Sequence, residues 1–134
     1  MQSTTQAAPG SKAMLWAGWI ITALVAAFLL LDGVMKLVKP EPVVEATVRL
    51  GYSESVIPVL GVVVLVCLAF YLVPRTSVLG AILLTGYLGG AVASHLRHDD
   101  GPFPVVFPAI FGALAWLGIW LRDPQLRALI PVRR

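Results

Sequence analysis

Four long apolar segments, separated by short polar or proline-containing stretches, dominate the pattern of the chain. They cover about residues 14–37, 55–73, 77–97 and 103–121. Each one approaches the roughly 20 residues that an α-helix needs to cross about 30 Å of hydrocarbon. The pattern therefore predicts an all-α membrane protein with four transmembrane helices.

The connections between these segments predict the topology. Only Pro74-Arg75-Thr76 joins the second span to the third, and residues 97–101 join the third to the fourth. Helices with connections this short are antiparallel neighbours. Pro40 and Pro42 end the first helix, and residues 41–50 are polar enough to leave the hydrocarbon as a short interfacial helix. We therefore expect an up-down-up-down bundle with one short helix between the first and second spans.

Both ends of the chain differ from the apolar segments. Residues 1–13 are small and polar, so we expect a disordered tail there, followed by one membrane bundle over residues 14–122. Residues 123–134 begin with Asp123 as a helix cap and carry basic side chains, which favours a basic interfacial tail at the lipid headgroups. A cleaved signal peptide is not expected, because the first apolar run continues through Leu31 without a polar start.

Composition supports a membrane location and excludes several classes of function. Of the 134 residues, 58% are hydrophobic and 13% are charged, and the mean hydropathy is +0.87. The basic residues form no stripe interleaved with aromatic side chains, so nucleic acid is not an expected partner. The one cysteine, Cys67, belongs to no zinc or redox pair and is expected to be a small core residue.

Basic and aromatic residues predict the orientation. An even number of spans puts both termini on one side of the membrane, and all four tryptophans lie near that side. Six basic residues fall on that side, against four on the other. They are Lys12, Arg75, Arg122, Arg127, Arg133 and Arg134. Because cytoplasmic segments carry the excess of Lys and Arg, we expect both termini to be cytoplasmic.

Ionisable side chains are costly in lipid, so each one within a span is a candidate for function. Asp32 and Lys36 lie four residues apart near the far end of the first span, where they can neutralise each other. Either the pair ends the span, with Lys36 reaching toward water, or it forms the polar part of a binding site. The sequence leaves both interpretations open.

A second polar cluster ends the third span on the same side of the membrane. His95 lies deeper than His98 and is either an interhelical hydrogen-bonding strut or an acid–base group. Arg97 falls about 160° from His95 around the helix, so the two cannot face one pocket unless the helix unwinds. His95, His98 and Asp99 are also the candidates for a metal site, but their spacing is common in polar loops and we expect no metal.

Small residues line one face of the third span. Gly86, Gly90 and Ser94 follow each other at four-residue spacing, which lets another helix backbone approach closely. We expect this face to pack against another helix of the same chain. A homo-oligomer formed through it stays open as an alternative.

Several short motifs together resemble the DoxX-like family of small bacterial membrane proteins. They are LDGVMKL at residues 31–37, LGY at 50–52, PRT at 74–76 and, above all, GYLGGAVASHLR at 86–97. The resemblance implies a multi-pass protein of the bacterial cytoplasmic (inner) membrane. The wider DoxX superfamily implies association with redox enzymes, either as a membrane subunit of a quinone-linked oxidoreductase or as a membrane partner of soluble thiol and oxidative-stress enzymes.

From these observations we expect an accessory or lipophile-binding module linked to a redox system, which holds a quinone-like molecule or docks a redox enzyme. Asp32, Lys36, His95 and Arg97 would form the polar end of an otherwise apolar pocket. One cysteine and two nearby histidines are too few to ligate haem or an iron–sulfur cluster, so a partner or a bound quinone would hold the electrons. The alternative is a cofactor-independent membrane enzyme, such as an isomerase, in which Asp32 or His95 transfers protons.

Overall fold

The computed structural model describes residues 9–99 and 101–133. The four long helices are α1 (Pro9–Val38), α3 (Ile57–Leu72), α4 (Ser77–His98) and α5 (Pro102–Arg122). The short helical elements are α2 (Glu41–Arg49), α6 (Pro124–Leu129) and the 3-10 turns η2 (Glu54–Val56) and η3 (Pro74–Thr76). The described residues contain no strand. The predicted all-α fold, with a short helix after the first span, is confirmed.

The ends of the bundle differ from expectation in one respect. Helix α1 begins at Pro9, so residues 9–13, which we expected in the tail, extend the first helix. Proline is tolerated in a first helical turn because the N–H it lacks would have no partner there. At the other end, Asp123 accepts hydrogen bonds from the N–H groups of Gln125 and Leu126 and caps α6 as predicted. The parts of the two predicted tails at residues 1–8 and 134 lie outside the described residues.

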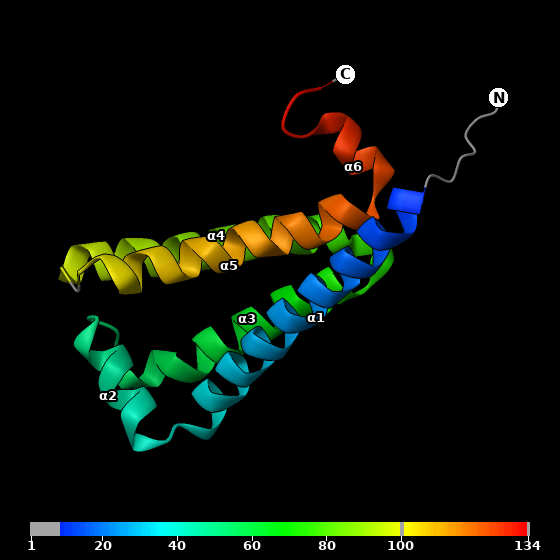
Figure 1. Cartoon of the computed structure of the whole chain (residues 1–134). Helices are drawn as coiled ribbons and strands as arrows, with labels where there is room; N and C mark the ends of the chain where they lie inside the picture. Colours follow the sequence, from blue (N-terminus) through cyan, green and yellow to red (C-terminus); the bar gives the residue numbers. More distant parts are fainter. Residues whose placement is uncertain (1–8, 100, 134) are drawn as a thin grey trace.

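The four long helices pack as a ring in chain order. Helix α1 packs against α3 and α5, and α4 packs against the same two helices. Consecutive long helices are therefore antiparallel neighbours, and the fourth closes back on the first. The start of α1 and the end of α5 lie at one end of the bundle, whereas α2 lies at the opposite end (Figure 1).

The outer surface of this ring is apolar. The helical stretches long and apolar enough to cross a membrane are Lys12–Val38, Glu54–Leu72, Pro74–His98 and Pro102–Arg122. Large aliphatic side chains on them face outward, with Leu24 65% exposed and Val59 56% exposed. Such a surface would promote aggregation in water, but it is the surface that lipid solvates. The chain is a multi-pass membrane protein.

The tightly packed core lies in the half of the bundle that carries the start of α1. Tyr71 of α3 is fully buried there, and its hydroxyl donates to the carbonyl of Ala115 in α5 across the ring (2.7 Å). Cys67 is buried one turn away, as predicted. Gly80 lets α4 approach so closely that a Cβ atom there would collide with the backbone of Tyr71. The α1–α3 pair and the α4–α5 pair converge at this end and diverge toward α2 (Figure 1).

Side-chain hydroxyls close the tight turn between α3 and α4. The last carbonyls of a helix have no helical N–H partners. Ser77 Oγ donates to the carbonyls of Tyr71 (2.8 Å) and Val73 (3.0 Å). Thr76 Oγ1 donates to the carbonyl of Phe70 (2.7 Å). The turn thus satisfies, within itself, polar groups that lipid could not.

Candidate functional site: a cavity between two helix pairs

A cavity of about 390 Å³ lies in the half of the bundle where the two helix pairs diverge. All four long helices contribute to its wall, and Thr47 and Leu50, from α2 and the turn after it, line it as well. Its polar lining residues are Asp32, Lys36, Thr47, Tyr52, Tyr87, Ser94 and His95. The cavity is therefore apolar on most of its wall and polar toward the end that carries α2.

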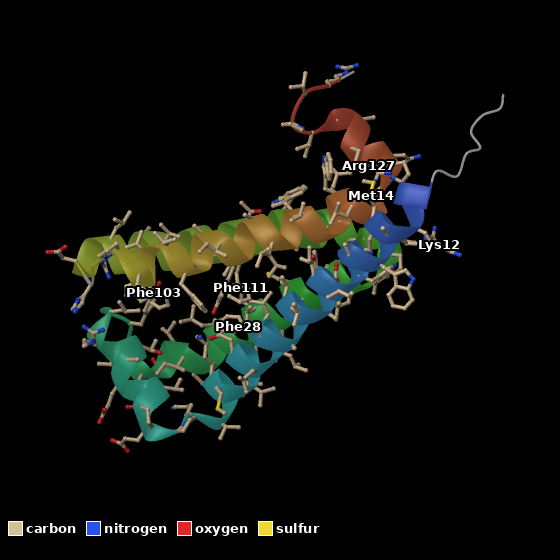
Figure 2. All side chains as sticks on the ribbon, in the orientation of Figure 1. Lys12, Met14, Phe28, Phe103, Phe111 and Arg127 are labelled. Carbon is tan, nitrogen blue, oxygen red and sulfur yellow. The ribbon has the colours of Figure 1, made fainter. Side chains whose placement is uncertain are left out.

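Aromatic rings form one wall of the cavity. Phe28 of α1 stacks on Phe111 of α5, with ring centroids 4.2 Å apart and planes inclined by 22°. Phe107 meets Phe28 edge-on at 5.3 Å, and Phe103 continues the row at 5.4 Å from Phe107. Figure 2 shows Phe28 and Phe111 projecting toward each other from the two helix pairs, with Phe103 nearer the end of the bundle that carries α2. Stacked and edge-on arrangements are the geometries that aromatic pairs prefer.

The predicted ion pair is formed and faces this cavity. Lys36 Nζ donates to Asp32 Oδ1 at 2.7 Å, one helical turn apart on α1. The side chains of Lys36 and Asp32 are only 16% and 30% exposed. Because the two charges cancel at contact distance, they give the cavity a polar end without a net charge. The pair thus lines the cavity as well as lying near the end of the span.

Helix α4 supplies the opposite polar groups. Tyr87, Ser94 and His95 line the cavity from this helix. Ser94 Oγ donates to the carbonyl of Gly90 (2.9 Å) and shares a hydrogen bond of 2.6 Å with Tyr52 Oη. His95 is half-buried and lines the same cavity as the Asp32–Lys36 pair, from the opposite helix pair.

Arg97 does not line the cavity. Its side chain is exposed, and Nη2 donates to the carbonyl of Leu50, in the turn after α2, at 2.9 Å. The continuous helix separates Arg97 from His95 around its axis, as their spacing requires. Of the four predicted ligand-binding residues, the structure brings Asp32, Lys36 and His95 together and places Arg97 outside the cavity.

The described residues at the histidine-rich end of α4 form no metal cage. His98 is exposed, and Asp99 adopts a left-handed conformation that ends the helix. Within residues 9–99 and 101–133, no group of three His, Cys, Asp or Glu side chains is placed to hold a metal ion.

The glycine motif of α4 serves a different purpose from the one we expected. A Cβ atom added at Gly86 or Gly90 would meet nothing within 4 Å, so neither glycine packs against another helix of the chain. Both line the cavity, and the space in front of them exists because they carry no side chain. Gly89 also has open space in front of it, but it lines a separate groove of about 340 Å³ between α4 and α5. The expectation of packing within the chain was wrong for these glycines.

Several lining residues were not identified from sequence. Tyr87 and Ser94 lie seven residues apart, two helical turns, on the face of α4 that carries Gly90 and Ala91. That stripe of hydroxyl groups was a usable signal. The three phenylalanines gave none, because Phe28, Phe107 and Phe111 are ordinary residues for a transmembrane helix.

Comparison with known proteins identifies the family of the chain. A scan against protein-family models matches residues 20–118 to the DoxX-like family. The chain belongs to the DoxX-like family. No curated protein and no solved structure matches it. In this DoxX-like protein the matched segment contains every residue that lines the cavity.

Proposed function

We propose that this DoxX-like protein binds a lipophile with a flat, uncharged, oxygen-bearing head, such as a quinone, as an accessory module of a redox system. The observation that carries the proposal is one cavity with aromatic rings on one wall and an ion pair, hydroxyl groups and an imidazole at one end. Its volume of about 390 Å³ falls within the roughly 300–1,000 Å³ typical of small-molecule sites.

The side chains present fit a quinone. An ammonium group carries three N–H donors, and the ion pair uses one from Lys36, which leaves donors for a quinone carbonyl. Asp32 fixes the position of that ammonium group. Phe28 and Phe111 offer ring surface to the head and the first part of the tail. When bound, a quinone supplies the electron-carrying chemistry.

The same arrangement favours an uncharged head over a phosphorylated one. The contact between Asp32 and Lys36 cancels both charges, so a phosphate would be buried beside a carboxylate with no net positive charge to offset it. A carbonyl or hydroxyl head needs only hydrogen bonds: Lys36 can donate to either head, and Tyr52 Oη, whose proton goes to Ser94, can accept from a hydroxyl.

The family resemblance supports the redox link, with a redox enzyme or a second copy of the chain as partner. The excess of basic residues beside the termini supports an inner-membrane protein with both ends in the cytoplasm. In that orientation, the polar end of the cavity faces away from the cytoplasm.

Matched glycine variants test the proposal. Gly90→Leu places a side chain in the cavity, whereas Gly89→Leu places the same side chain, on the same helix, in the separate groove. We expect Gly90→Leu to weaken binding of a short-tailed ubiquinone analogue at least about tenfold. Gly89→Leu should leave binding within about twofold. Calorimetric titration of the protein in lipid nanodiscs measures both. Equal affinities for the two variants, or no binding by the parent chain, would overturn the proposal.

A second candidate is the membrane enzyme. It is favoured by one observation, that Asp32 and His95 line the same cavity and so could act on one bound substrate. His95→Gln keeps a hydrogen-bonding side chain but cannot transfer protons near neutral pH. Unimpaired turnover of a lipophilic substrate by this variant would exclude His95 from the chemistry.

A further inference from the structure

A short segment of the chain covers the polar end of the cavity. We call residues 40–50, which comprise α2 and the turn after it, the latch segment. Thr47 and Leu50 face the cavity, and Thr47 is only 8% exposed. The charged side chains of Glu41, Glu45 and Arg49 are exposed. The latch segment therefore has an inner face that lines the cavity and an outer face that is charged.

Two side-chain contacts connect this part of the chain to α4. Arg97 Nη2 donates to the Leu50 carbonyl at 2.9 Å, and Tyr52 Oη and Ser94 Oγ are 2.6 Å apart. Helix α2 itself packs mainly against α1 and η2, its neighbours in sequence. Among the described contacts, the Arg97–Leu50 hydrogen bond joins the latch segment itself to α4, and the Tyr52–Ser94 hydrogen bond holds the chain just after it.

The chain bends sharply on either side of the latch segment. Lys39 has a φ of 61° and Gly51 a φ of 102°, both in the left-handed region that L side chains rarely adopt. Arg97 lies directly against the second bend, because a Cβ atom on Gly51 would be 2.7 Å from its Nη2. A change in backbone angles at these two residues would swing the segment as a unit.

We propose that the latch segment controls access to the cavity, that Arg97 is the catch that holds it closed, and that the Tyr52–Ser94 hydrogen bond steadies the bend on which it turns. The inference rests on the proposed binding site and assigns Arg97 a role in gating it. A hydrogen bond to a charged donor is stronger than one between neutral groups, so Arg97 holds more firmly than Ser94. Removing either contact increases the fraction of molecules in which the cavity is open.

Cysteine labelling tests the latch without any ligand. Ala91→Cys puts a thiol in the cavity wall, and a charged methanethiosulfonate reagent reports how often water reaches it. We expect Arg97→Gln to raise its labelling rate in nanodiscs about tenfold, and Tyr52→Phe to raise it several-fold. Arg75→Gln, in η3 just before the start of α4, should leave the rate unchanged. The buried Cys67 stays in place, and its background is measured on the parent chain.

A surface thiol controls for reagent and protein quality. Glu45→Cys lies on the exposed outer face of α2, so its labelling rate should be the same with and without Arg97→Gln. Equal labelling of Ala91→Cys in the parent and in the Arg97 and Tyr52 variants would overturn the latch.

Ligand kinetics separate a gating residue from a binding residue. If Arg97 gates the cavity, Arg97→Gln speeds association and dissociation of the short-tailed quinone together, and the Kd changes by less than about threefold. If Arg97 contacts the ligand, dissociation alone speeds up, which contradicts the latch. Faster labelling in a protein that binds no quinone would support the latch and refute the proposed ligand. If quinone binding requires Gly90 but labelling is unchanged in the Arg97 and Tyr52 variants, the proposed ligand is supported and the latch is refuted.

Discussion

Replacement of Asp32 and Lys36, singly and together, measures how far the ion pair stabilises the bundle. Asp32→Asn removes the carboxylate that pairs with the Lys36 ammonium, and Lys36→Met removes the ammonium that pairs with the Asp32 carboxylate. The double variant replaces both charges with uncharged groups of similar size. A double-mutant cycle isolates the interaction between the two positions.

The structure sets the expected magnitude. At 2.7 Å, opposite unit charges attract by about 1.5 kcal/mol in water and by about 6 kcal/mol at an effective dielectric constant of 20, before desolvation is subtracted. Exposed pairs contribute up to about 1 kcal/mol, while breaking a fully buried pair costs about 3–5 kcal/mol. Both side chains here keep a minor part of their surface exposed, so each single variant should lose about 2 kcal/mol. The double variant should lose no more than either single one.

Steric trapping in bicelles measures the free energy of unfolding of the four proteins in the cycle: the parent, the two single variants and the double variant. If the losses of the single variants simply add in the double variant, the two charges do not stabilise each other and the ion pair contributes nothing. The same proteins report on binding. We expect the stable double variant to bind the short-tailed quinone about tenfold more weakly, because it lacks the ammonium donor.

Three further predictions concern packing and orientation. Tyr71→Phe removes the hydroxyl bonded to Ala115 and should cost about 0.6–1.7 kcal/mol of unfolding free energy in bicelles; no loss would show that this bond is not a net stabiliser. Gly80→Ala should destabilise by at least about 2 kcal/mol, because its Cβ meets the backbone of Tyr71, whereas Gly89→Ala should be nearly neutral. A reporter enzyme that works only in the cytoplasm should be active at either terminus, and one that works only after export should be inactive at both. Activity of the exported type at either terminus would contradict the proposed orientation.

The fold was largely predictable because each element has a local cause. Apolar runs of membrane length predicted the spans, and the short Pro74-Arg75-Thr76 connection predicted an antiparallel pair. The Asp32–Lys36 contact was predictable for the same reason, since residues four apart on a helix are neighbours wherever the helix lies.

The cavity was not predictable, because it arises from how the helix pairs diverge. Gly86 and Gly90 have the spacing of a helix-packing motif, and only the tertiary arrangement shows that they face open space. Arg97 was expected with His95 at the polar end of the pocket, although the helical spacing already put the two side chains on different sides. The helix points them to different sides, and Arg97 finds its partner in Leu50, 47 residues away.

The hydroxyl-closed turn between α3 and α4 bears on how the protein is made. Ser77 and Thr76 satisfy the last carbonyls of α3 from within the turn, so the two helices and their connection form a unit with few polar groups left open. Such a helical hairpin can partition into the bilayer during synthesis before α5 has been translated. Substituting both hydroxyls would then act first on membrane insertion, and appear as chains degraded or left outside the bilayer.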